Sequence, residues 1–116
     1  MAASKNPRIR LLHIRDEIDA VAAASRSASL ADYQNDYMLK RTVERALQII
    51  SEAARALPSE LLARHPEAPW ASIIGIGNVL RHEYQHIDEK RLWEIVTGDL
   101  PKLSSVVLAM LKELDG

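Results

Sequence analysis

The chain has 116 residues, a formal net charge of −1 and no cysteine. Its length allows a single modest core, so residues 1–116 are predicted to form one domain. The balanced charge excludes a general attraction to nucleic acid. The lack of cysteine excludes disulfides and thiol catalysis. No apolar run approaches the length of a membrane span, and residues 1–7 lack the apolar core of a signal peptide, so we expect a soluble, cytoplasmic protein that does not enter membranes.

The first half of the chain carries two helical patterns. Apolar residues recur at intervals of three and four over residues 8–23, which predicts an amphipathic helix. After a break of small residues, Ser29 and Asp32 form a capping-box pattern that can begin the next helix. The apolar stripe continues to Leu57 and Pro58 ends it, so we expect one long helix up to that point.

The second half predicts three more helices after a short helical turn at residues 59–65. Pro69 is well placed as a first helical residue. Asp88 can cap a further helix that Gly98 would stop, and residues 99–114 carry the apolar stripe of a last helix. No segment alternates with a period of two for long enough to form a sheet. The predicted fold class is all-α, an antiparallel bundle of four main helices plus short accessory helices.

The segment "NVLRHEYQHID" contains two overlapping motifs. His82 to His86 matches H-E-x-x-H, in which two helical histidines bind zinc. Catalytic zinc needs a third protein ligand, and the spacing of the later carboxylates indicates none. The helix is also expected to end between Tyr84 and Asp88, which would turn His86 away from His82. We therefore expect no metal site and no cofactor.

The second motif needs no metal. Asn78 and His82 are four residues apart on one helical face, and Arg81 and Tyr84 lie on a neighbouring face. Histidine can move protons near neutral pH, and arginine pairs with phosphate oxygens, so the set suits RNA cleavage at the 2′-hydroxyl. One protomer offers one such histidine, so this chemistry favours a homodimer. The alternative is that Arg81 and His82 belong to a solvated helix edge while Tyr84 packs in the core.

Three stretches resemble the HepT-like family of HEPN-domain toxins. They are "PWASIIGIGNVLRHEYQHID", "LWEIVTGDLPKL" and the earlier "RTVERALQIISEAARALPSELLARHPEAPW". The resemblance covers about residues 11–114, and its most specific elements are Asn78, His82, Tyr84 and the Trp-Glu-Ile-Val phrase at residues 93–96. It implies a HEPN-like helical bundle that dimerises around a shared cleft and a metal-independent ribonuclease that inhibits growth.

The resemblance also implies roles for individual residues. His82 matches the family's catalytic histidine, and Asn78 matches its polar residue. Tyr84 matches the tyrosine that receives AMP from the cognate antitoxin, a minimal nucleotidyltransferase of the MntA type, in a type VII toxin–antitoxin system. An added phosphate would place negative charge beside a site that must accept a phosphate, which would inactivate it.

The chain departs from the family motif at one position. Gly77 stands where the motif has arginine, so the cation must come from Arg81, or from another helix through Arg41, Arg45 or Arg91, unless the site is weakened. Glycine costs a helix roughly 1 kcal/mol relative to alanine, a loss that close packing of another backbone, such as that of a dimer partner, would explain.

We therefore expect a homodimeric ribonuclease toxin in which His82 is the acid or base and Asn78 orients either His82 or the substrate phosphate. Arg81 is expected to stabilise the phosphorane, and Tyr84 is the expected control point. The rival interpretation is a catalytically weakened HEPN domain that binds the nucleotidyltransferase or a nucleotide. Gly77→Arg should change a competent enzyme little and should activate a dead one.

Overall fold

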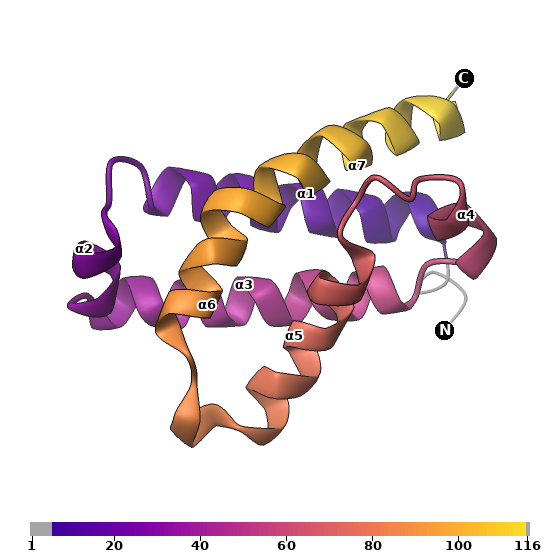
Figure 1. The fold of residues 1–116 in the computed structure, drawn as a ribbon. Helices are drawn as coiled ribbons and strands as arrows, with labels where there is room; N and C mark the ends of the chain where they lie inside the picture. The colour runs from indigo at the N-terminus through magenta and orange to yellow at the C-terminus, as the bar shows by residue number, and fades with distance from the viewer. Residues whose placement is uncertain (1–5, 116) are drawn as a thin grey trace.

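The computed structural model describes residues 6–115, with the backbone alone at Tyr84, and the regular elements in that range are all helical (Figure 1). In chain order they are α1 (Pro7–Ala24), α2 (Leu30–Gln34), α3 (Tyr37–Arg55), α4 (Ser59–Ala63), α5 (Trp70–His82), η2 (Tyr84–His86), α6 (Glu89–Glu94), η3 (Ile95–Asp99) and α7 (Leu100–Asp115). The stretch from α6 to α7 is continuous. The predicted all-α bundle of four main helices with short accessory helices is confirmed.

Helix α3 lies at the centre of the bundle. Helix α1 packs along it, α5 packs against another of its sides, and α7 crosses over α1 (Figure 1). Each of these helices contributes side chains with no exposed surface, among them Leu11, Ile14, Val43, Leu47, Ile50, Ile73, Leu103, Val107 and Met110. Burying one such aliphatic side chain contributes about 1.5–3 kcal/mol, so this core fixes how α5 sits on α3.

The predicted long second helix is wrong, because it is two helices. Ser29 begins α2 with the expected capping box, its side chain accepting from the Asp32 amide while the Asp32 carboxylate accepts from the Ser29 amide. Helix α2 ends at Gln34, and Asp36 then caps α3 by accepting from the Leu39 amide at 3.0 Å. The break lets the buried Tyr33 turn into the core while α3 takes a new direction.

The predicted stop at Gly98 is also wrong. The chain widens into a π-helical turn over Ile95–Asp99 and continues directly into α7. The amide of Leu100 bonds to the carbonyl of Ile95, five residues back, as a π turn requires. Pro101 follows immediately, and a proline ring would clash with the carbonyl four residues earlier in a regular α-helix. The wider turn lets the helix pass through this point without a break.

Helix α6 is held beside α5 by contacts to α2 and α3. Lys40 of α3 pairs with Glu89 of α6 at 3.1 Å. The ring of Tyr33 stacks on Trp93, with 5.0 Å between the ring centroids. These contacts fix the position of the side of α6 that faces α5. None of the helices in residues 6–115 combines the length and apolar character that crossing a membrane requires.

Candidate active site at the end of helix α5

Helix α5 presents three of the predicted site residues to solvent. Its buried side faces the core through Ile73, Ile76, Gly77 and Leu80. Asn78 and His82 are exposed, and their spacing of four residues places them on one face of the helix. Arg81 is exposed beside His82 in the last turn. Among residues 6–115, no ion pair or side-chain hydrogen bond engages any of these three side chains, so all are available to a ligand.

The helix ends at His82. Glu83 has left helical geometry, with φ −126° and ψ 33°, although its amide still bonds to the Val79 carbonyl at 2.8 Å. A single 3₁₀ turn, Tyr84–His86, follows. The backbone therefore places Tyr84 two residues after His82 on a turn outside the helix. The Tyr84 side chain, on which the predicted AMP modification falls, lies outside the described part of the structure.

The zinc motif does not keep the geometry that its chemistry needs. Two histidines bind one ion in H-E-x-x-H because one continuous helix places them a turn apart. Here the helix ends at His82, and His86 belongs to the 3₁₀ turn. Within the described residues, no group of three or more His, Asp or Glu side chains is arranged to hold a metal ion. The helix thus ends two residues before the predicted range of Tyr84 to Asp88, and His86 lies outside it.

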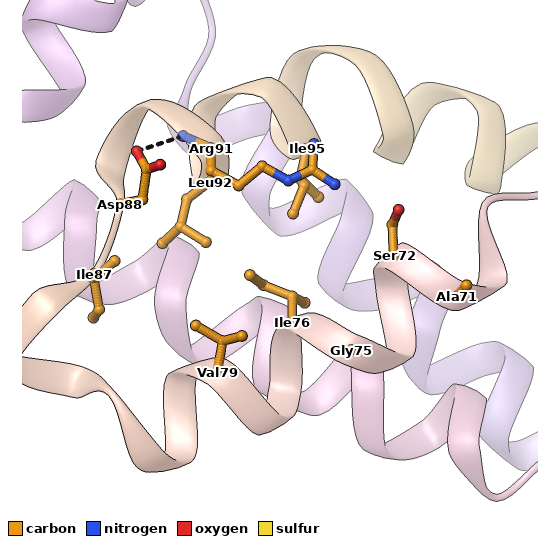
Figure 2. Close-up of a pocket in the computed structure, with 10 residues that line it drawn as sticks. All are labelled: Ala71, Ser72, Gly75, Ile76, Val79, Ile87, Asp88, Arg91, Leu92 and Ile95. Atoms are coloured by element: carbon orange, nitrogen blue, oxygen red, sulfur yellow. Dashed lines mark hydrogen bonds between the residues drawn. The ribbon is translucent and has the colours of Figure 1, made fainter.

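A groove of about 300 Å³ lies between α5 and α6 (Figure 2). Its lining is mainly apolar and consists of Ala71, Ser72, Gly75, Ile76, Val79, Ile87, Asp88, Arg91, Leu92 and Ile95. Gly75, Val79 and His82 recur at helical intervals, so His82 lies at one end of the side of α5 that borders this groove. In Figure 2 the Arg91 side chain extends over the groove toward Ser72, away from Val79.

The four arginines considered as the cation differ in their surroundings. Arg41 pairs with a glutamate of its own helix, and its guanidinium lies 4.8 Å from the centre of an exposed tyrosine ring. Arg91 lies 3.7 Å from a glutamate one turn on. Arg45 is exposed on α3. Only Arg81 comes from α5 itself, directly beside His82, which makes it the arginine best placed to act with that histidine.

Gly77 points into the bundle, not toward solvent. It is buried, and a β-carbon built on it would lie 2.2 Å from the Ser51 Oγ. The expectation that a partner's backbone packs here is wrong, because the close neighbour is the Ser51 side chain of the same protomer. The absence of arginine at this position is therefore tied to the contact between α5 and α3. The expectation that Gly77→Arg would change a competent enzyme little is wrong, because the first side-chain atom of any residue at position 77 would collide with Ser51.

Comparison with known proteins identifies the family. Residues 14–110 match the family model described as Ribonuclease HepT-like. The chain belongs to the HepT-like ribonuclease family. The match runs from α1 into α7 and includes the whole of α5, so the family predicted from the motifs is confirmed.

Individual relatives agree with this HepT-like assignment. A protein of Caldanaerobacter subterraneus subsp. tengcongensis, named as a candidate RNase, is 33% identical over 94% of this chain and 97% of its own length. A candidate RNase of Methanocaldococcus jannaschii is 33% identical over 84% of this chain and 89% of its own. A protein of Thermococcus cleftensis, named as a probable ribonuclease HepT, is 32% identical over 78% of this chain and 82% of its own length. No solved structure matches the chain. These similarities support ribonuclease activity for this HepT-like chain.

Proposed function

We propose that this HepT-like protein is a metal-independent RNA endonuclease, the toxin of a type VII toxin–antitoxin system that acts in the cytoplasm, with residues 1–116 as one catalytic domain. The observation that carries the proposal is the exposed edge at the end of α5. There Asn78, Arg81 and His82 lie together with no side-chain partner among the described residues. Metal-independent phosphodiester cleavage needs a group that transfers protons and a cation that stabilises the phosphorane, and an amide can orient either the phosphate or the imidazole.

The proposed reaction is attack by the RNA 2′-hydroxyl on the adjacent phosphorus. His82 takes the proton from the 2′-oxygen, which forms the new P–O bond. The bond to the 5′-oxygen breaks, and that oxygen receives a proton from a second histidine. Arg81 stabilises the added negative charge on the phosphorane, and Asn78 orients the phosphate or the imidazole. The products are a 2′,3′-cyclic phosphate and a free 5′-hydroxyl, and no metal ion takes part.

The need for two histidines supports a homodimer. One protomer brings one His82, and a twofold axis next to the exposed edge of α5 would bring the second. One imidazole would then act as the base while the other acts as the acid. The apolar groove beside this edge is available for contacts in such an arrangement.

Regulation is proposed to act through Tyr84. A cognate nucleotidyltransferase of the MntA type would transfer AMP to the tyrosine hydroxyl, forming a phosphodiester and releasing pyrophosphate from ATP. The new phosphate would add negative charge two residues from His82, where RNA phosphate must bind. The position of Tyr84 on the turn after α5 supports this role.

The second candidate function is a catalytically weakened domain that binds the nucleotidyltransferase or a nucleotide. It is favoured by Gly77, which leaves the motif without its arginine. The two candidates differ in RNA cleavage by the purified protein. A weakened domain would bind its partner tightly but leave RNA intact.

The test first measures RNA cleavage by the purified protein in the presence of EDTA. A separate sample is incubated with ATP, magnesium and the nucleotidyltransferase, and its intact mass and its RNA cleavage are then measured. We expect cleavage in EDTA, then a gain in intact mass by AMP units and loss of cleavage. Tyr84→Phe is the matched variant, because it keeps the ring and removes the acceptor oxygen. It should cut RNA, gain no mass and stay active in the presence of the antitoxin.

Two outcomes would count against this proposal. Mass gain on Tyr84→Phe would move the modification to another residue. Cleavage that EDTA abolishes and that His86→Ala also removes would restore the zinc interpretation, because His86 has no role in the proposed reaction.

A further inference from the structure

The contact between Gly77 and Ser51 is closer than any other residue at position 77 would allow. Ser51 lies on α3 with 1% of its surface exposed, and it faces Gly77 on α5. A β-carbon on residue 77 would lie 2.2 Å from the Ser51 Oγ and 2.7 Å from the Ser51 Cβ. Non-bonded carbon atoms prefer about 3.5–4.0 Å, so even alanine would force the two helices apart.

The Ser51 hydroxyl uses this close approach to bond across the helix pair. Its Oγ donates to the backbone carbonyl of Ile74 at 2.8 Å. A serine inside a helix commonly bonds back to its own helix, but this one reaches the neighbouring helix. In an α-helix the carbonyl of Ile74 is also the acceptor for the amide four residues later, which is that of Asn78. The hydroxyl therefore contacts the turn of α5 that carries the first site residue.

We propose that Ser51 and Gly77 are a compensating pair. The Ser51 side chain occupies the space that the first atoms of an arginine side chain at position 77 would need. Its hydroxyl also holds α5 on α3 through the hydrogen bond to Ile74. Both Ser51 atoms that a β-carbon at position 77 would strike are side-chain atoms. Arginine at position 77 can therefore fit between the two helices only when residue 51 is glycine, which has no side chain.

The pair gives Ser51 a role as a positioning residue for the exposed edge of α5. The hydrogen bond to Ile74 fixes the rotation of α5 about its axis and its position along α3 at the turn that presents Asn78. His82 follows one turn later on the same face. Positioning errors of about 1 Å can cost a reaction on the order of 100-fold. This second part of the inference rests on the proposed ribonuclease function, whereas the compensating pair does not.

The compensating pair is tested by thermal unfolding of four proteins: the parent, Gly77→Arg, Ser51→Gly and the double variant. Gly77→Arg alone should lower the melting temperature by roughly 5–15 °C, since overpacking a core at this scale is costly. Ser51→Gly removes both colliding atoms, so the double variant should melt higher than Gly77→Arg. If Gly77→Arg does not fold, the melting temperature of Gly77→Ala is compared with that of the Gly77→Ala, Ser51→Gly double variant instead. A double variant no more stable than the single substitution at position 77 would overturn the pair.

The positioning role is tested with Ser51→Ala, which keeps the Cβ and removes only the hydroxyl. We expect the NMR resonances of the Ile74 carbonyl and the Asn78 amide to shift, and kcat for RNA cleavage to fall about tenfold or more while KM changes little. Ser25→Ala is the matched control, because its hydroxyl also donates to a backbone carbonyl, that of Val21 at 2.7 Å, at the C-terminal end of α1. It should leave these resonances and kcat unchanged.

Unchanged resonances and kcat in Ser51→Ala would overturn the positioning role. If the parent cleaves no RNA, the proposed function fails, and the melting temperatures and the NMR shifts still decide the inference about Ser51.

Discussion

Replacing Tyr33 with phenylalanine should stabilise the fold. The Tyr33 side chain has no exposed surface and stacks on Trp93, yet its hydroxyl has no hydrogen-bond partner among the described residues. A buried polar group without a partner costs about 1–3 kcal/mol. Tyr33→Phe keeps the stacked ring and removes the hydroxyl, so we expect the free energy of unfolding at pH 7 to rise by about 1 kcal/mol.

The same residue makes stability depend on alkaline pH. Burial raises the pKa of the Tyr33 hydroxyl above its usual value of 10.0, and the carboxylates of Glu44 and Glu89 raise it further, against an opposing effect of Arg41. The folded state then holds the proton more tightly than the unfolded chain. The stability that depends on the neutral phenol is complete below pH 10 and is lost as the pH rises from there toward the folded pKa. Within that window the loss is about 1.4 kcal/mol per pH unit.

The assay is urea unfolding followed by circular dichroism at pH 7 and pH 11 for the parent and Tyr33→Phe. The variant should be more stable at pH 7, and its advantage should widen at pH 11. Tyr37→Phe is the matched control, because Tyr37 is 65% exposed and its substitution should change neither value by much. A Tyr33→Phe protein that is less stable than the parent at pH 7, and that loses as much stability as the parent at pH 11, would show that the buried hydroxyl does not lower the stability of the fold.

Three further substitutions have defined outcomes. Arg81→Ala should lower kcat for RNA cleavage by roughly 100-fold and flatten its dependence on salt, which single-turnover assays at several salt concentrations would measure, with Arg45→Ala showing a smaller effect. Asp88→Ala removes the acceptor for the Arg91 amide at the start of α6, so urea unfolding should show a loss of about 1 kcal/mol. Ile73→Ala empties a fully buried position between α5 and the core and should cost about 2–5 kcal/mol in the same assay.

The helical caps were the part of the fold that sequence predicted best. Ser29 with Asp32, and Asp88 with the Arg91 amide, form the expected bonds because each cap involves residues within three positions of one another. The boundary at Asp36 was available in the same way, since aspartate is a preferred cap. It was missed because the apolar stripe continues on both sides of it, so periodicity alone favoured a continuous helix.

The passage through Gly98 could not be predicted from local preferences. Glycine after an apolar stripe usually ends a helix. Here a π turn carries the chain on to α7, and the buried Ile95, Val96 and Leu100 pack that turn into the core. Tertiary packing therefore decided against the local stop signal.

The site was predictable to the extent that it depends on one helix. Spacing alone placed Asn78 and His82 on one face, and the helix does end before His86. The groove and the Ser51 contact were missed, because they depend on how α5 sits against α6 and α3. Gly77 was noticed only as a departure from a motif, and its buried neighbour on α3 supplies the physical reason for it.

In the proposed mechanism, His82 transfers the proton in RNA cleavage. The most direct measurement is the rate of RNA cleavage in EDTA by the parent and by His82→Ala, with His13→Ala, an exposed histidine of α1, as the control. We expect the parent and His13→Ala to cut RNA equally fast, and His82→Ala to cut RNA about 100- to 10,000-fold more slowly with an unchanged melting temperature. A His82→Ala protein that cuts RNA as fast as the parent would show that His82 does not transfer the proton.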